Sequence, residues 1–209
     1  MAELKHRFYR DTQRQGIGET VNDAGYKIMQ EIDLMGKHVM EIGPGSLPHI
    51  RYWKGQPQQY TLVDIQQNIL DLAGSILKER SIQVNSHRVE SPQLPIPSEQ
   101  IDVLISFYSL EHLYPLDNYI SELERVLKPG GVLIGAIPAE GGLAWGVGRF
   151  LTSRRYIKKN FQIDPDKIIS WMHPNFANKI MTQLGNRFNV ERWKFLAFSN
   201  SFYRYEFDN

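Results

Sequence analysis

The chain has 209 residues, of which 42% are hydrophobic and 22% charged, and these values are ordinary for one globular domain over residues 1–209. The formal net charge is only +1, so no overall field favours nucleic acid, and the absence of cysteine excludes disulfides, thiolate nucleophiles and cysteine-bound zinc. The polar start and the lack of a long apolar run predict a cytoplasmic protein without an integral membrane segment, although peripheral membrane contact stays open.

The first predicted elements lead to a glycine-rich turn. Apolar residues at Ala24, Ile28 and Ile32 recur at helical spacing, so a helix is expected over residues 21–34, with Gly36 at its C-terminal cap. Residues 37–42 are short and largely apolar, which favours a strand. Gly43-Pro44-Gly45 ends that strand.

Strands and helices then alternate along the chain. Further strands are expected at 60–64, 82–89, 101–107 and 132–137, and helices at 68–80, 118–127 and 174–184. A turn is expected at 128–131, and strands at 190–198 and 202–207 form a hairpin around Ser199-Asn200-Ser201. This order predicts an α/β fold of three layers, with a Rossmann-like, mostly parallel, seven-stranded sheet and an antiparallel C-terminal hairpin strand.

Two acidic residues stand where a nucleotide ligand is expected. Ligands of such sheets bind beyond the carboxyl ends of the strands, where Gly43 and Gly45 allow close approach of the backbone. Asp64 ends the next strand, at a position that commonly accepts hydrogen bonds from ribose. Glu41 in the first strand would repel a pyrophosphate and suits a cation. The pattern therefore favours S-adenosylmethionine over NAD.

Four segments taken together resemble the class I S-adenosylmethionine-dependent methyltransferases, of the small-molecule, methyltransferase type 11-like kind. They are Val39–Gly45, Leu62–Asp64, Leu94–Ser106 and Leu123–Leu133. The resemblance implies that the cofactor is contacted by Glu41, Gly43, Pro44, Gly45, Asp64, Ile65, Glu90, Ser91, Ser106 and Phe107.

The resemblance also implies a role for each part of this set. Gly43 and Gly45 flank the methionine portion, and Glu41 acts through its ammonium or by shaping the loop. Asp64 holds the ribose, Ile65 packs on adenine, and Glu90 and Ser91 lie near the adenine amino group. Ser106 and Phe107 lie beside the methionine tail.

The glycine loop departs from the family's commonest pattern at one position. That pattern has a third glycine where this chain has Leu47, so the loop is expected to bend differently over residues 46–49.

The segment after the fourth strand carries the candidate catalytic group. His112 titrates near neutral pH and is a candidate general base, and ordering of the turn or cofactor binding is the alternative. Tyr108 lines the acceptor pocket or packs in the core. No metal site is predicted.

Residues 139–173 are expected to form a lid over the acceptor, and residues 1–20 a cover over the cofactor. Candidate acceptor contacts are Trp145, Arg149, Arg154, Arg155 and His173, and a helix over 145–159 would bring Arg154 and Lys158 together. A solvated basic face is the alternative for the lid, and a capping or core role is the alternative for His173.

These features predict methyl transfer to a small molecule, sugar or glycolipid-type acceptor, at oxygen or nitrogen. A cofactor-binding module that acts through a protein partner is the alternative. A nucleic-acid substrate is not expected, because the charge is near neutral and residues 106–109 lack the motif that stacks a flipped base. The oligomeric state is left open.

Overall fold

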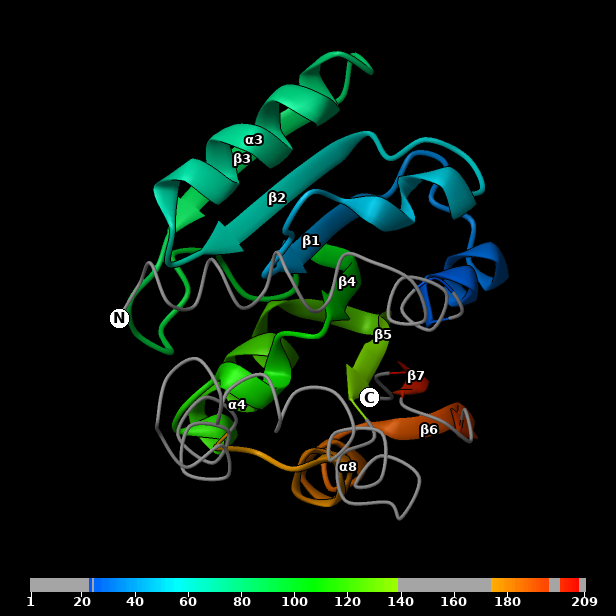
Figure 1. Cartoon of the computed structure of the whole chain (residues 1–209), viewed down its shortest axis with the longest axis vertical. Coiled ribbons are helices and arrows are strands. Elements are labelled where there is room, and N and C mark those ends of the chain that lie inside the picture. Colours follow the sequence, from blue (N-terminus) through cyan, green and yellow to red (C-terminus); the bar gives the residue numbers. More distant parts are fainter. Residues whose placement is uncertain (1–22, 24, 139–173, 196–199, 207–209) are drawn as a thin grey trace, which may run out of the picture.

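The computed structural model describes residues 23, 25–138, 174–195 and 200–206. They build one sheet with the strand order β3-β2-β1-β4-β5-β7-β6 (Figure 1). The strands are β1 (His38–Ile42), β2 (Gln59–Asp64), β3 (Gln83–Arg88), β4 (Ile101–Phe107), β5 (Leu127–Pro138), β6 (Asn189–Phe195) and β7 (Asn200–Glu206). Strands β1 to β5 are parallel, whereas β7 pairs antiparallel with β5 and with β6.

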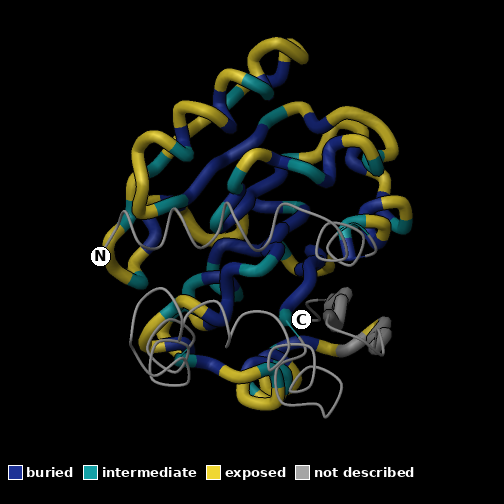
Figure 2. The backbone as a smooth tube through the Cα atoms, in the orientation of Figure 1, coloured by how far each residue is buried: buried dark blue, intermediate teal, exposed yellow. Residues whose placement is uncertain are grey.

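Helical segments cover both faces of the sheet and make three layers. The helices are α3 (Gln67–Lys78), α4 (Leu116–Val126) and α8 (Ala177–Gly185), with 3-10 segments η1 (Lys27–Glu31), η2 (Pro48–Tyr52) and η3 (Leu110–His112). Val39 packs into a core with η1, η2 and α3, whereas Met40 packs into a second core with α4 and α8. The buried strands run between these more exposed segments (Figure 2), so the Rossmann-like parallel arrangement is confirmed.

The strand order places one edge of the sheet for ligand binding. From β1 the chain goes outward to β2 and β3 and then returns to β4 on the other side. The neighbouring strands β1 and β4 therefore mark the switch point, and a crevice opens beyond their carboxyl ends in folds of this kind.

The expected helix over residues 21–34 is wrong in its extent. The described residues 23, 25 and 26 are α-helical and run into η1, but the helical segment ends at Glu31 because Ile32 is already extended, with φ −125°. Leu34 N–H donates to the Lys54 carbonyl at 2.8 Å, which draws the chain along residues 54–56 instead of continuing a helix. Gly36 has φ +69°, but it belongs to this turn and caps no helix.

The turn expected at residues 128–131 is also wrong, because these residues belong to strand β5. β5 begins at Leu127, which pairs with Ile101, and the register shifts between Ile101 and Val103. Gly130, with φ +72°, accommodates this irregularity inside the strand. Asn200 and Ser201, expected in the hairpin turn, belong to β7.

Candidate functional site

The glycine loop after β1 has the backbone freedom that the sequence predicts. Gly43 and Gly45 have φ of +70° and +54°. A Cβ at Gly43 would lie 2.6 Å from the Ser109 Cβ, so only glycine fits there, whereas a Cβ at Gly45 would meet no atom of the described residues within 4 Å. Pro44 between them is buried. Gly45 therefore presents its backbone to open space at the switch point of the sheet.

Leu47 keeps the loop closed although it is not a glycine. It has φ +53° and ψ +49°, in the left-handed region that favours glycine, and its N–H donates to the Pro44 carbonyl at 3.0 Å. Its side chain is only 2% exposed and packs in the core. The loop thus takes a conformation that suits a glycine at this position, and burial of the leucine side chain offsets the strain.

Glu41 lies under this loop and is only 1% exposed. The Tyr60 hydroxyl donates to its Oε2 at 2.6 Å, and His49 Nε2 lies 3.0 and 3.2 Å from its two oxygens. Trp53 Nε1 in turn donates to His49 Nδ1 at 2.9 Å. Glu41 therefore joins β1, β2 and η2 directly below the glycine loop.

The tyrosines around Glu41 remain protonated. Burial, followed by the charge of Glu41, raises the pKa of Tyr60 well above its usual value, and the same causes raise the pKa of Tyr26 to about 12. Sequence analysis did not identify His49, Trp53 or Tyr60 as parts of this network. The only signal was the spacing of four that joins His49 to Trp53, and a pair of that kind is common in helical segments.

The end of β2 presents an acid and an exposed apolar side chain. Burial raises the pKa of Asp64, and its carboxylate accepts a hydrogen bond from Gln66 N–H at 2.8 Å. Ile65 follows with 57% exposure. The Arg88 guanidinium donates to the Ile65 carbonyl at 3.1 Å and pairs with Glu90. The structure thus brings Asp64, Ile65 and Glu90 to one edge, and Ser91 is exposed next to Glu90.

Ser106 and Phe107 are placed below the loop rather than at the surface. Ser106 is fully buried, and its Oγ lies 2.6 Å from Ser109 Oγ. Since Ser109 donates its own proton to the Ile42 carbonyl, Ser106 is the donor in this pair. Phe107 is 6% exposed and stacks on His49 with ring centroids 5.0 Å apart. Both residues support the loop from beneath.

Tyr108 packs toward the N-terminal segment. It has φ +55°, and a Cβ added at Gly25 would lie 2.5 Å from its hydroxyl. Its ring meets Tyr26 edge-on at 5.8 Å, and burial raises the pKa of the hydroxyl far above its usual value. Of the two roles considered for Tyr108, packing is the one that this geometry describes.

His112 lies on η3, beyond the end of β4. Its side chain is 33% exposed, and its Nε2 is 3.9 Å from Oε1 of the buried Glu111. Asn175 holds this segment by donating from its backbone N–H to the Glu111 carbonyl, and from its side chain to the Leu110 carbonyl. His112 is therefore anchored and accessible on the side of the switch point that β4 contributes.

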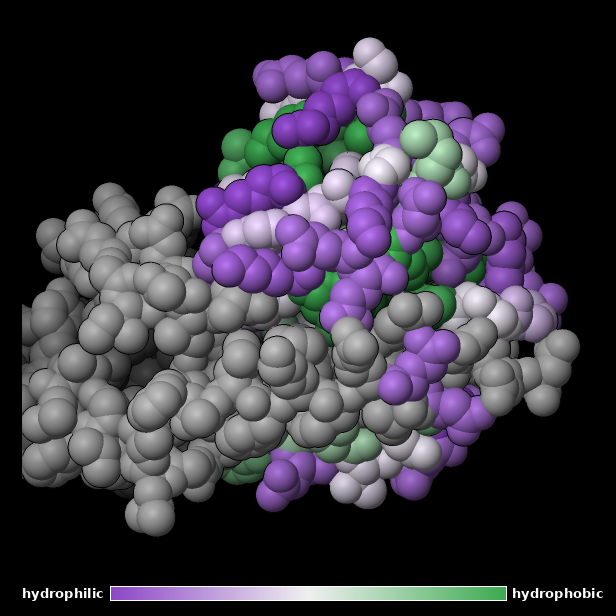
Figure 3. Space-filling view, turned by 90° about the vertical axis from the view of Figure 1, so that its right-hand side faces the viewer, coloured by the Kyte–Doolittle hydropathy of each residue, from purple (hydrophilic) through white to green (hydrophobic). Residues whose placement is uncertain are grey.

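The remaining acceptor candidates lie outside the described residues. They are Trp145, Arg149, Arg154, Arg155 and His173, together with the expected lid over 139–173 and the cover over 1–20. Among the described residues no group of three or more metal-ligating side chains occurs, and no described helix is long and apolar enough to cross a membrane. On the face in Figure 3, hydrophilic side chains predominate over the described part of the surface.

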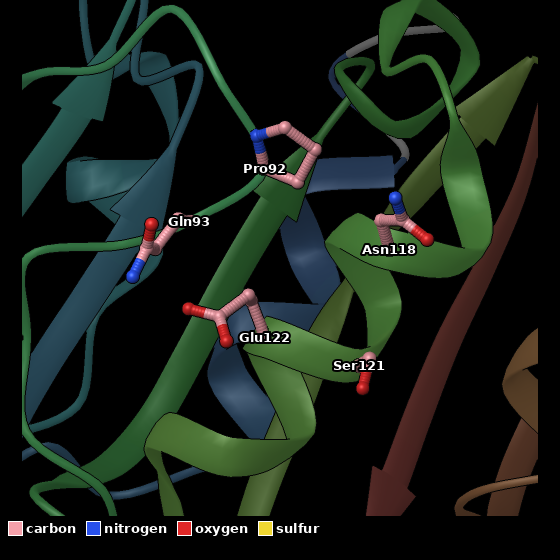
Figure 4. A pocket seen from close by; sticks show the side chains of 5 residues that line it. All are labelled: Pro92, Gln93, Asn118, Ser121 and Glu122. Atoms are coloured by element: carbon pink, nitrogen blue, oxygen red, sulfur yellow. The ribbon is translucent and has the colours of Figure 1, made fainter.

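A pocket lies between α4 and the loop after β3 (Figure 4). Pro92 and Gln93 of the loop line it, and so do Asn118, Ser121 and Glu122 of α4. The Glu122 carboxylate already accepts hydrogen bonds from Leu94 N–H and from Arg125. The pocket begins next to Ser91 and contains none of the predicted site residues.

Comparison with known proteins identifies the domain. A family model described as "Methyltransferase domain" matches residues 40–135, which include the loop, Asp64 and His112. Residues 40–135 of this chain therefore match a methyltransferase domain, which supports a class I S-adenosylmethionine-dependent methyltransferase.

Relatives and solved structures agree with this assignment. A ubiquinone/menaquinone biosynthesis C-methyltransferase of Shewanella sediminis is 30% identical over 55% of this chain and 45% of its own length. A malonyl-[acyl-carrier protein] O-methyltransferase of Serratia marcescens is 27% identical over 52% of this chain and 41% of its own length. The chain thus spans less than half the length of these curated relatives. A solved S-adenosylmethionine-dependent methyltransferase of Aquifex aeolicus has the same fold, with a TM-score of 0.63 and 16% sequence identity. The match covers 87% of this chain and 88% of the Aquifex aeolicus chain.

The cofactor of the methyltransferase domain is S-adenosylmethionine. The described residues fit it, because Gly45 faces open space and Ile65 is exposed beside the Asp64 carboxylate. A cationic ligand also suits an edge that carries the buried carboxylate of Glu41.

Proposed function

We propose that the whole protein transfers a methyl group from S-adenosylmethionine to a small organic acceptor. The observation that carries this proposal is the open backbone of Gly45 between Glu41 and Asp64, at the switch point of the sheet. In folds of this kind, ligands bind at that edge.

Within this proposal each described residue has a defined task. Gly43, Pro44 and Gly45 contact the methionine portion through the backbone, and Asp64 accepts hydrogen bonds from the ribose. Ile65 covers one face of adenine, and the loop at Glu90 and Ser91 borders its amino group. Glu41, Ser106 and Phe107 act from beneath, by holding the glycine loop in place.

The sulfonium supplies an activated methyl group, so the protein has mainly to orient the acceptor in line with it and to exclude water. A new bond forms between the methyl carbon and the acceptor while the carbon–sulfur bond breaks, and its electron pair stays on sulfur. An acceptor hydroxyl must also lose its proton. We assign that proton to the imidazole of His112, which is anchored and partly exposed.

We propose a sugar or glycolipid-type acceptor, methylated at oxygen or nitrogen. The cations and aromatic side chains in residues 139–173, including Arg149, Arg154 and Arg155, support an acceptor that carries negative charge or many hydroxyls. Trp145 and His173 are the further candidates for its pocket.

A second candidate is an acceptor that is methylated at carbon. The name of the Shewanella sediminis relative favours it, because that protein is a C-methyltransferase, whereas the Serratia marcescens relative is an O-methyltransferase. A phenol that loses its proton becomes nucleophilic at ring carbon as well as at oxygen. His112 would therefore serve both candidates.

An acceptor panel decides between these proposals. The protein is incubated with S-adenosylmethionine labelled with ¹³C in the methyl group and with sugars, glycolipid precursors, phenols and amines, and formation of S-adenosylhomocysteine is followed. The ¹³C shift of the product identifies the methylated atom. Cofactor binding without turnover on any acceptor would favour the non-catalytic module, and retention on DNA or RNA at low salt would contradict a small-molecule acceptor.

A further inference from the structure

We propose that Trp53 and His49 are positioning residues that keep Glu41 as a buried anion under the cofactor loop. Trp53 holds His49 as a neutral imidazole, and the retained charge of Glu41 favours a cationic ligand over its neutral product. This inference rests on the cofactor position proposed above. It adds a reason why the site should distinguish S-adenosylmethionine from S-adenosylhomocysteine, which lacks the sulfonium charge.

The donors and acceptors around His49 define its protonation state. An indole N–H can only donate, so His49 Nδ1 must accept the bond from Trp53 at 2.9 Å. The single ring proton is then on Nε2, which donates to the Glu41 carboxylate at 3.0 and 3.2 Å. A second proton on Nδ1 would face the indole N–H directly. His49 therefore remains uncharged beside Glu41.

Packing prevents the His49 ring from turning over. The side chain is fully buried and stacks on Phe107, with centroids 5.0 Å apart and planes at 30°. Trp53 is fixed as well, because it stacks on Tyr60 at 5.5 Å with planes at 18°. The donors to Glu41, which are Tyr60 and His49, and the donor to His49, which is Trp53, thus belong to one rigid group of rings.

The charge of Glu41 is not neutralised by the described residues that face it. Its partners are the Tyr60 hydroxyl from β2 and the neutral His49 from η2. From the N-terminal side it faces Tyr26, whose pKa of about 12 keeps the hydroxyl neutral. Arg51 of η2 pairs with Asp23 at the surface. A buried anion of this kind is costly unless a cation lies nearby, and the sulfonium and ammonium of the ligand are such cations.

The Trp53→Phe substitution tests this account, because it removes the N–H and keeps an aromatic ring. Without the indole N–H, Nδ1 of His49 is open to a second proton when binding is compared at pH 8 and at pH 6, and the added positive charge would offset that of Glu41. We expect the preference for S-adenosylmethionine over S-adenosylhomocysteine to fall on the order of tenfold over this range, as one added charge near the ligand predicts. In the native protein the preference should change less than about twofold.

Two further variants separate the charge from packing. His49→Gln with Trp53→Phe cannot gain a charge, yet its amide can still donate to Glu41, so the pH dependence should disappear. Tyr52→Phe is the matched control, because it removes only a hydroxyl that donates to Asp23 from the same segment. Both ligands are titrated calorimetrically at each pH.

The outcomes distinguish this inference from the proposed function. The charge argument would be overturned if Trp53→Phe lost equal affinity for S-adenosylmethionine and S-adenosylhomocysteine, or if its preference between them did not depend on pH. Either result would leave cofactor binding by the native protein intact. Failure of the native protein to bind either ligand would overturn the proposed function instead. If Trp53→Phe does not fold, ¹⁵N NMR of the native imidazole decides: we expect a proton only on Nε2 of His49 from pH 6 to 8, and a doubly protonated ring would contradict the proposal.

Discussion

At the scale of single residues, Leu47 shows how the loop tolerates a strained backbone. A left-handed conformation costs a non-glycine residue about 1–2 kcal/mol, whereas burial of a leucine side chain contributes about 1.5–3 kcal/mol. Leu47 has φ +53° and is only 2% exposed, so both effects apply to it. Burial of the side chain is the larger of the two and stabilises the strained loop.

Two substitutions at Leu47 separate these effects. Leu47→Ala should lower the free energy of unfolding by about 2–4 kcal/mol, because it loses the buried side chain and keeps the strain. Leu47→Gly loses still more apolar surface but relieves the strain, so we expect it to be about as stable as Leu47→Ala or up to about 1 kcal/mol more stable. Denaturant unfolding measures both. If Leu47→Gly were clearly less stable than Leu47→Ala, the conclusion that the backbone is strained at Leu47 would be contradicted.

Asp64 should bind the cofactor at a cost in stability. Burial raises its pKa in the folded state, so the folded protein holds the proton more tightly and stability decreases as the pH rises through that range. Asp64→Asn should therefore raise the Tm at neutral pH while weakening S-adenosylmethionine binding by about tenfold, the loss of a charged hydrogen bond. Asp71→Asn on the exposed side of α3 should change neither property greatly. A lower Tm in Asp64→Asn would contradict the burial argument.

His112→Gln tests the proposed base. Loss of general base catalysis should lower kcat for a hydroxyl acceptor by about 10²–10⁴-fold and leave the Kd for S-adenosylmethionine unchanged. His87→Gln, on the outer strand β3, is the matched control and should retain full activity. An acceptor whose methylated atom carries no proton to lose should be much less affected. Full activity of His112→Gln on a hydroxyl acceptor would remove the assignment.

Sequence analysis could place residues at strand ends but not the contacts between elements. Gly43, Asp64 and Ile65 follow from hydrophobic strands that end at polar or glycine positions. The burial of Ser106 depends on Ser109 and the Ile42 carbonyl from another strand. The Glu41 network likewise joins three segments, and nothing in the local pattern pairs His49 with Glu41.

At the scale of elements, tertiary hydrogen bonds explain where a helix predicted from the spacing of apolar residues ends early. The apolar spacing before residue 34 is helical, yet Leu34 and Gly36 bond to Lys54 and Gln56, so the helical segment ends with η1 at Glu31. By contrast, α3 and α4 were predicted to within two residues at each end, because their apolar faces pack on the sheet without such competition.

Arg187 lies two residues after α8, connects that turn to α4 and allows a test of this contact between elements. It donates to Glu124 at 2.7 Å and to Asp117 at 3.2 Å, and its side chain is 29% exposed. Because solvent screens such pairs, Arg187→Ala should lower the free energy of unfolding by only about 1 kcal/mol. The difference from the native protein should shrink in about 1 M salt. A loss that does not depend on salt would indicate lost packing of the side chain instead.

At the scale of the whole molecule, the cofactor should stabilise the fold that creates its site. The mostly parallel sheet with helices on both faces was predictable from alternating strands and helices, since crossover rules leave few arrangements. Ligand at about 100 times its Kd adds about 2.7 kcal/mol, so S-adenosylmethionine should raise the Tm by roughly 5–10 °C. NAD at the same concentration should produce no shift, and a comparable shift with NAD would favour a dehydrogenase.

The most direct measurement is calorimetric titration of S-adenosylmethionine into the native protein and into Gly45→Ala and Gly130→Ala. Both glycines have positive φ, of +54° and +72°, and open space at the Cβ position, but Gly130 lies at the start of β5, far along the chain from the loop. Both variants should lose about 1 kcal/mol of stability. We expect one-site binding that weakens about tenfold or more only in Gly45→Ala. Equal affinities in the two variants, or no binding by the native protein, would contradict the proposed site.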